Sequence, residues 1–204
     1  MKKPAQLTTV ERISEVALGL IERGGSEAVT MRVVAQAVGI TPMAIYHHFP
    51  NREALLQAVT DREFERLAAF QQARLKKLPP RVRPRTVMFE LMHGYIDYAM
   101  ARPLLFDYVF SRERPGARRF PEDFRARRSP TATPLADAIE AGMAAGWLRK
   151  DDAWEVTMLM AGSLHGWLVL YRGKRFSYSE AEFRAFCDRG MDRLLAGLRN
   201  KEIS

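Results

Sequence analysis

Helix start and stop signals recur along the whole chain, and no segment shows the alternation of apolar and polar residues that marks a strand. Residues 8–11 (TTVE) have the spacing of a capping box, in which a hydroxyl and a carboxylate bind the free backbone N–H groups of a helix start. Apolar residues then recur at helical spacing from Ile13 to Leu20, and Gly24 ends the run. This punctuation predicts an all-α protein of about nine helices.

Prolines, glycines and capping residues divide the rest of the chain in the same way. Short helices are expected after Thr30 and after Thr41, and Pro42 occupies the first position of the second, where a missing N–H costs little. Ser177 and Glu180 form another candidate capping box. The other expected elements are helices over 52–78, 84–102, 104–111, 135–146, 156–171 and 183–198, and a long loop over 112–134.

The net charge of +8 suggests an anionic partner but does not locate one. Residues 1–50 hold five Lys and Arg against four Asp and Glu, whereas residues 81–130 hold eleven against six. An apolar fraction of 47% allows a sizeable core, and a single cysteine excludes an internal disulfide and suits a reducing compartment. No secretory signal is evident, and segment 156–171 is short for a membrane span, so we expect a cytoplasmic protein without a membrane partner.

The segment from Thr30 to Leu56, TMRVVAQAVGITPMAIYHHFPNREALL, carries the most specific signal. It predicts two short helices joined by a glycine turn, which is the arrangement of a helix-turn-helix. Ile45 and Phe49 are four residues apart, so they face inward together. The second helix then presents outward Thr41, Pro42, Met43, Ala44, Tyr46 and His47. Small and apolar groups suit thymine methyls in a major groove, and hydroxyl and imidazole groups suit phosphate oxygens.

This segment resembles the DNA-binding module of the tetracycline-repressor (TetR) family. The resemblance covers roughly residues 8–60 and rests on a threonine that opens the second helix, an Ala-x-x-x-Gly run at 35–39, the sequence YHHF at 46–49, and a basic residue three positions later. That residue is Arg52, where the family usually has lysine; arginine keeps the positive charge and can contact phosphate. The resemblance implies a helix-turn-helix DNA-binding domain over 1–52 and a helical ligand-binding and dimerisation domain over 53–204.

The resemblance also assigns roles by position. Phosphate contacts are expected from Thr30, Thr41, Tyr46, His47 and Arg52. Base-edge contacts are expected from Met43 and Ala44, with Pro42 adjacent. Core positions are expected at Ile45, Phe49 and Leu55. The function implied is a homodimeric repressor that a small apolar or aromatic ligand releases from a palindromic double-stranded DNA operator.

The rest of the chain matches the family only in architecture. Family members hold a small-molecule pocket in this helical body and dimerise through their last two long helices. Methionine and aromatic side chains suit an adaptable apolar pocket. The candidate pocket residues are Met88, Met92, Tyr95, Phe106, Phe110, Met143 and His165. The same positions also fit plain core, and His93 and His165 also fit hydrogen-bonded core histidines.

Other features have a structural interpretation beside a functional one. His47 and His48 point about 100° apart on a helix, which disfavours a metal pair, and we expect neither metal nor cofactor. The motif at 162–166 (GSLHG) allows close helix approach, either at a dimer interface or within the chain. The arginines of segment 112–128 form a solvated loop or bind an anionic partner. Cys187 is expected to be a small buried side chain.

Two other functions compete with the ligand-gated repressor. An α-helical enzyme or carrier lacks support, because the sequence shows no nucleophile–base pair, phosphate loop or paired carboxylates, and we expect no enzyme. A constitutive DNA-binding regulator would carry the same motif, but the body is larger than dimerisation alone requires. Specific, salt-sensitive DNA binding tests the first alternative, and ligand-induced release tests the second.

Overall fold

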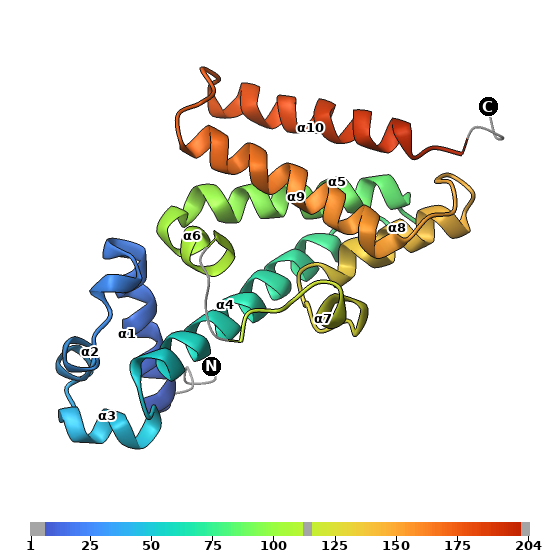
Figure 1. Ribbon diagram of the computed structural model, residues 1–204. Helices are drawn as coiled ribbons and strands as arrows, with labels where there is room; N and C mark the ends of the chain where they lie inside the picture. Colours follow the sequence, from blue (N-terminus) through green and yellow to red (C-terminus); the bar gives the residue numbers. More distant parts are fainter. Residues whose placement is uncertain (1–6, 112–115, 201–204) are drawn as a thin grey trace. The chain divides into compact units, whose positions relative to one another are not determined.

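The computed structural model describes residues 7–111 and 116–200, and most of these residues are helical. They form ten α-helices and one 3-10 turn, with no strand among the described residues, so the all-α prediction is confirmed. The helices are α1 (Thr9–Gly24), α2 (Met31–Val38), α3 (Pro42–His48), α4 (Arg52–Leu75), α5 (Pro84–Ala101), α6 (Pro103–Ser111), α7 (Glu122–Arg125), α8 (Thr133–Ala144), α9 (Ala153–Arg172) and α10 (Glu180–Gly197) (Figure 1). No described helix is long and apolar enough to cross a membrane.

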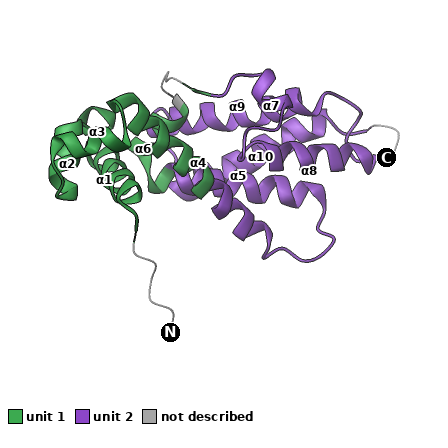
Figure 2. Ribbon diagram, turned by 90° about the horizontal axis from the view of Figure 1, so that it is seen from below, with its two compact units in different colours: residues 1–66, 100–117 green, residues 67–99, 118–204 purple. Residues whose placement is uncertain are grey.

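The chain divides into two compact units (Figure 2). Unit 1 comprises residues 1–66 and 100–117, and unit 2 comprises residues 67–99 and 118–204. Helix α4 therefore begins in unit 1, and its last residues belong to unit 2. Helix α6 belongs to the same unit as α1, α2 and α3, although it lies about sixty residues further along the chain.

The first three helices of unit 1 begin at threonine caps. Thr8 and Glu11 form the predicted capping box, and the bond from the Thr8 backbone N–H lowers the pKa of the Glu11 carboxyl. The hydroxyls of Thr30 and Thr41 accept the backbone N–H groups of Val33 and Ala44, at 3.2 and 3.1 Å. These local bonds explain why the sequence alone was sufficient to predict the three helix starts.

A buried carboxylate joins three parts of unit 1. The Glu63 side chain on α4 is 1% exposed, yet it accepts hydrogen bonds from Arg66 at 2.8 Å and from Arg102 at 2.9 Å. Arg66 also binds Glu15 of α1, and Arg102 lies 3.3 Å from Glu22 of the same helix. Two opposite charges compensate the burial of the carboxylate, which would otherwise be costly.

In unit 2, α5, α9 and α10 pack around an apolar core. Met88 and Met92 of α5, Leu164 of α9, and Phe183 and Met191 of α10 are all buried. Figure 1 shows α9 and α10 running side by side. Their contact includes a Trp167 ring that lies over Gly190, so close that a β-carbon on this glycine would come within 2.5 Å of the indole.

Ion pairs connect the outer faces of α5 and α10. Arg85 binds Asp192 through two nitrogens, the closest pair at 2.6 Å. Asp97 accepts a bond from Arg184 at 2.7 Å. These side chains are a quarter to a half exposed, so each pair is partly solvated.

The structure corrects three details of the sequence predictions. The last helix is capped by Ser179 with Glu182, and not by Ser177 with Glu180. The long helix α4 ends at Leu75, three residues before the predicted end. The predicted loop 112–134 contains the short helix α7.

The arginine-rich segment is held by ion pairs instead of forming a freely solvated loop. Arg125 binds Asp152 at 2.6 Å, and Arg127 binds Glu140 at 2.8 Å. The first of these bonds lowers the pKa of the Asp152 carboxyl, which also caps α9. Residues 112–115 of this segment lie outside the described residues.

Candidate functional site

Helix α3 is fixed at both ends and along its inner face. Thr41 caps its start, Pro42 occupies its first turn, and the backbone N–H of Phe49 closes its end on Ile45. The side chains of Ile45, Phe49 and Leu55 are buried, as predicted. Gly39 turns the chain between α2 and α3 with a φ of +78°, in the left-handed region that other residues rarely adopt.

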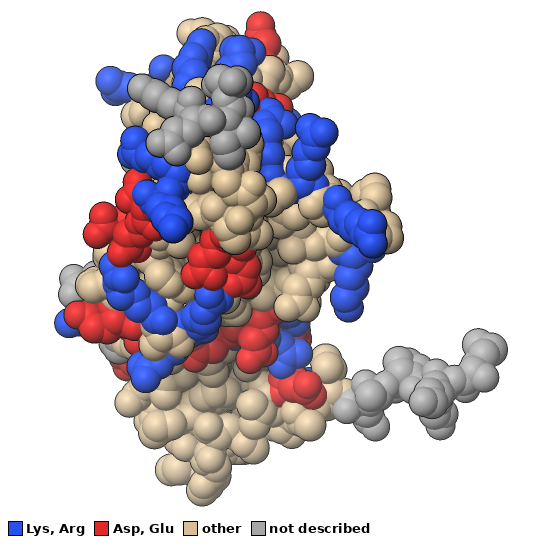
Figure 3. Space-filling model, turned by 90° about the vertical axis from the view of Figure 1, so that its right-hand side faces the viewer, with Lys and Arg blue, Asp and Glu red and all other residues tan. Residues whose placement is uncertain are grey.

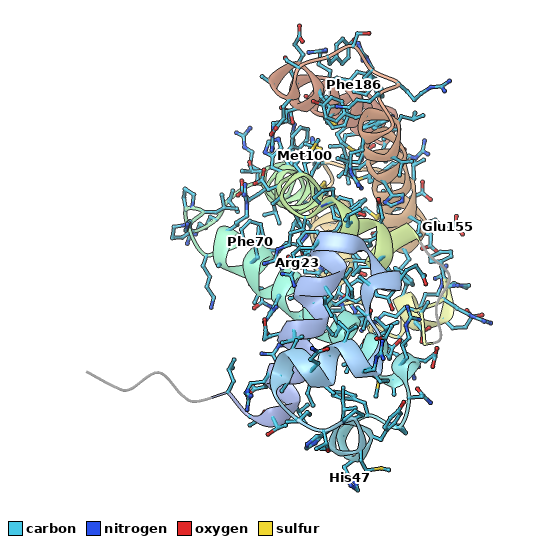
Figure 4. All side chains as sticks on the ribbon, turned by 90° about the vertical axis from the view of Figure 1, so that its left-hand side faces the viewer. Arg23, His47, Phe70, Met100, Glu155 and Phe186 are labelled. Atoms are coloured by element: carbon cyan, nitrogen blue, oxygen red, sulfur yellow. The ribbon has the colours of Figure 1, made fainter. Side chains whose placement is uncertain are left out.

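The opposite face of α3 is open. Met43 is 71% exposed and Tyr46 49% exposed, which are high values for such large side chains. His47 is also exposed and points away from the neighbouring helices in Figure 4. Of the six side chains predicted to face outward, Thr41, Pro42, Met43, Tyr46 and His47 are exposed, and Ala44 is half-buried.

The exposed face of α3 combines apolar side chains such as Met43 with hydroxyl and imidazole groups. The helix contains no Lys, Arg, Asp or Glu. Figure 3 shows basic and acidic side chains intermingled over much of the face in view, and few of either at its lower end. The net positive charge of the chain is therefore not concentrated on the exposed face of α3. Because phosphates are bound mainly by positive charges, any arginine close to this face matters for binding an anionic partner.

Arg32 is such an arginine, although it was not among the residues predicted from the sequence to contact DNA. It is exposed in the first turn of α2, two residues after Thr30, and Gln36 follows on the same exposed side one turn later. The amphipathic pattern of α2 could have identified them. Its apolar side is buried, which leaves positions 32 and 36 facing outward; the buried residues are Met31, Val34, Ala35 and Val38.

Arg52 has backbone partners that the sequence did not indicate. Its Nε donates to the backbone carbonyl of Val29 at 2.7 Å, and a terminal nitrogen donates to that of Ser26 at 2.6 Å. Glu27 lies 3.8 Å from the same guanidinium. The arginine thus binds the segment that leads into α2, while its assignment to a phosphate stays a prediction.

The candidate pocket residues are distributed over both units. Met88 and Met92 are buried in unit 2, where Met143 is half-buried. Phe106 and Phe110 belong to unit 1, where their rings lie 5.2 Å apart, and Phe110 packs edge-on against Phe64. Met88, Met92 and Phe106 therefore belong to the apolar core and Phe110 packs on aromatic rings, while a role of the seven residues in ligand binding stays a prediction.

Two histidines of unit 2 are hydrogen-bonded. The Tyr95 hydroxyl lies 3.1 Å from Nδ1 of His165, and burial raises the pKa of this tyrosine well above its usual range. His93 binds Asp188 at 2.7 Å. Both histidines are thus hydrogen-bonded, although the side chain of His93 is 33% exposed and lies outside the core. The Tyr95–His165 pair places two polar groups beside the buried residues of α5 and α9. Among the residues that the structure describes, no group of His, Cys, Asp and Glu has the arrangement of a metal site.

One face of α9 has no partner within the described chain. A β-carbon added at Gly162 or Gly166 would meet no atom within 4 Å, so these glycines do not serve packing inside the described chain. Leu159 and Leu170 lie on the same helical stripe and are 47% and 46% exposed. By contrast, Leu198 at the end of α10 is buried within its own chain, so the apolar stripe of α10 is mostly intrachain core.

Comparison with known proteins gives matches over both parts of the chain. Residues 8–59 match the model for bacterial regulatory proteins of the tetR family, and residues 88–194 match a tetracyclin repressor-like C-terminal domain. The HTH-type transcriptional repressor KstR of Rhodococcus jostii is 37% identical over 102 residues, which are 50% of this chain and 45% of KstR. The chain therefore matches less than half the length of this curated relative.

Solved structures share the fold over nearly the whole chain. A protein of unknown function from Rhodococcus sp. RHA1 superposes with a TM-score of 0.80 at 20% identity, covering 98% of this chain and 100% of that one. The regulator FadR from Bacillus subtilis, in complex with stearoyl-CoA, gives a TM-score of 0.71 at 13% identity, covering 92% and 98%. With two family models matched, one of them over more than half of the chain, this protein belongs to the TetR family of DNA-binding transcriptional regulators.

Proposed function

We propose that this protein is a repressor that binds a near-palindromic operator as a homodimer and is released by a small, largely apolar ligand. The observation that carries the proposal is the open face of α3, where Met43 and Tyr46 are exposed on a helix whose other side is locked into the core. The KstR relatives are named repressors, which supports repression. A protein that acts on the chromosome belongs in the cytoplasm, and nothing in this mechanism requires catalysis.

In this proposal α3 enters the major groove. Met43 and Ala44, with Pro42 beside them, contact base edges. Phosphates are contacted by the hydroxyl and imidazole groups of Thr30, Thr41, Tyr46 and His47, and we add Arg32 to this set. Two copies read two half-sites that are a whole number of helical turns apart.

Salt titration of DNA binding tests these roles, with operator sequences first selected from random DNA by the wild-type protein. We expect Met43→Ala to change the base preferred at one position of each half-site without changing the salt dependence. We expect Arg32→Ala to lower the slope of log affinity against log salt by about one per protomer. No selective DNA binding by the wild-type protein would refute the function.

For the dimer, we propose that the stripe of Leu159, Gly162, Gly166 and Leu170 meets a second copy of the same chain. Exposed leucines at this spacing are costly in water, and glycines between them let two helix backbones approach closely. Leu198 beside α10 is not a suitable position for testing the dimer, because it is buried within its own chain and a charge there would disrupt the fold.

Sedimentation tests this interface. Leu159→Glu combined with Leu170→Glu should give a folded monomer that binds operator weakly. Leu104→Glu changes another exposed leucine, on α6, and should leave the dimer intact. A wild-type protein that is monomeric at micromolar concentration would rule out the interface.

For the ligand, we propose that an apolar chain or ring occupies the body near Met88 and Met92, and that Tyr95 and His165 bind its polar group. The FadR structure contains stearoyl-CoA, which makes long acyl thioesters the first compounds to try. Stearoyl-CoA should release the protein from DNA, whereas free coenzyme A should not. Tyr95→Phe should weaken release without affecting DNA binding. A constitutive regulator would stay bound with every compound.

A further inference from the structure

Arginines from two flanking helices bind the last residue of α2 and the segment that leads into it. Arg12 of α1 donates to the backbone carbonyl of Val38, the last residue of α2, at 2.6 Å. Arg52 of α4 donates to the carbonyls of Ser26 and Val29, just before the Thr30 cap, at 2.6 and 2.7 Å. All three acceptors are backbone atoms, so the bonds fix the path of the chain and not the orientation of a side chain.

The chemistry of these bonds favours arginine. A carbonyl in the last turn of a helix has no intrahelical donor, and a cation there also complements the helix dipole. A guanidinium presents several donors in a rigid plane, so Arg52 can bind two carbonyls at once. A lysine ammonium is a compact point charge without this fork, but it keeps the positive charge and can still bind a phosphate oxygen.

We propose that Arg12 and Arg52 are positioning residues for DNA recognition. They fix α2 against α1 and α4, and α3 follows because it is joined to α2 through the Gly39 turn and packs on it. Arg52 acts in this way in place of contacting a phosphate. The part of this inference that concerns DNA affinity rests on the proposed function. The part that concerns the position of α2 does not, because the arginine bonds are present without DNA.

Charge-conserving and charge-removing variants separate positioning from phosphate contact. Arg52→Lys keeps the charge and loses the fork, Arg52→Gln loses both, and Arg12→Gln removes the other bond. Arg23→Gln is the control, because it removes an exposed arginine of α1 (Figure 4). Each variant is titrated with the DNA selected by the wild-type protein, over a range of salt, at a temperature where circular dichroism shows it fully folded.

For positioning residues, Arg52→Lys, Arg52→Gln and Arg12→Gln should each weaken DNA binding by about tenfold, as expected for loss of charge-assisted hydrogen bonds. The salt slope of Arg52→Gln should equal that of the wild type. The proposal for Arg52 is overturned if Arg52→Lys binds like the wild type and Arg52→Gln lowers the slope by about one per protomer. It is also overturned if none of the three variants changes affinity.

Amide hydrogen exchange of the DNA-free protein gives a second, independent readout. The amides of α2 should exchange at least several-fold faster in Arg12→Gln and Arg52→Lys, while those of α10 should be unchanged. If the wild-type protein selects no DNA, the proposed function fails but this measurement still decides whether the arginines fix α2. Unchanged exchange throughout α2 would overturn the positioning role.

Discussion

Helix α2 of unit 1 and the long helices of unit 2 are held to neighbouring helices in different ways. Around α2, guanidiniums of other helices bind backbone carbonyls, as Arg12 does at Val38 and Arg52 does at Val29. Between α5, α9 and α10 of unit 2, side chains bind side chains: Arg85 pairs with Asp192, and the Trp167 ring packs edge-on against Phe186. Bonds to the backbone fix the position of the helix backbone, whereas contacts between side chains determine which faces of two helices pack together.

The difference suits the two tasks that the proposed function would assign to this chain, which are binding DNA and responding to a ligand. A DNA groove has a given shape, so the helix that enters it needs a fixed backbone. A sensing body must exist in two arrangements, and side-chain pairs that are partly solvated exchange partners at small cost. The following substitutions test this contrast, in order of decreasing expected effect on stability.

The largest effect is expected in unit 1, at the buried Glu63. Replacing both Arg66 and Arg102 with alanine leaves this carboxylate, 1% exposed, without the two partners that the structure gives it. We expect a loss of roughly 3–5 kcal/mol in the free energy of unfolding, measured by urea denaturation. Adding Glu63→Met should recover most of the loss. A cost below about 1 kcal/mol would show that the charge is already well solvated.

The second effect concerns packing between α9 and α10. Gly190→Ala places a β-carbon 2.5 Å from the Trp167 ring, which cannot move aside as a flexible chain would. We expect a destabilisation of about 1–3 kcal/mol. Gly197→Ala lies in the same helix with no atom within 4 Å of the new carbon, so it should be neutral or slightly stabilising. Equal thermal shifts in the two variants would contradict the tight contact.

The third effect concerns the caps of the recognition module. Thr30→Ala and Thr41→Ala each remove a hydroxyl that accepts a backbone N–H, at 3.2 and 3.1 Å. Each should cost about 1 kcal/mol, and serine at the same position should restore it. Thermal unfolding reports the cost. If alanine and serine behave alike, the hydroxyl bonds do not define the helix starts.

The smallest effect is expected at the α5–α10 ion pairs of unit 2. Arg85→Gln, Asp192→Asn and the double variant form a double-mutant cycle on side chains that are 42% and 46% exposed. Their coupling energy should be below about 1 kcal/mol and should fall further at high salt. A coupling energy as large as the loss of unfolding free energy expected at Glu63 would show that the exposed ion pairs of unit 2 hold their helices as strongly as the pairs of the buried Glu63 in unit 1.

Local chemistry made much of unit 1 predictable. Thr8, Thr30 and Thr41 each act on a backbone N–H within three residues, so the helix starts are legible from the sequence. The same logic was ambiguous at the last helix, because Ser177 with Glu180 and Ser179 with Glu182 both have capping-box spacing. The structure has the second pair, and Phe183 in the first turns of this helix stacks on the ring of Tyr171, 4.1 Å away between centroids.

Other features depend on contacts between distant residues, which leave no local pattern. The acceptors of Arg52 are the backbone carbonyls of Ser26 and Val29, and any residue type would offer the same oxygen. Leu198 falls on an apolar stripe whether its partner is its own chain or a second one. The sequence therefore predicted the fold class and the outward face of α3. It singled out the glycines of α9 without deciding between a dimer interface and packing within the chain, and it gave no sign of the bonds that Arg12 and Arg52 make.

Cys187 offers a way to observe unit 2 from within. It is the only cysteine of the chain, it is fully buried on α10, and burial raises the pKa of its thiol to about 12. A thiol reagent should therefore react only with molecules in which α10 has opened. The labelling rate then measures how often this part of unit 2 opens. A ligand or operator that stabilises unit 2 would slow the reaction, and one that loosens it would speed the reaction, without an engineered cysteine.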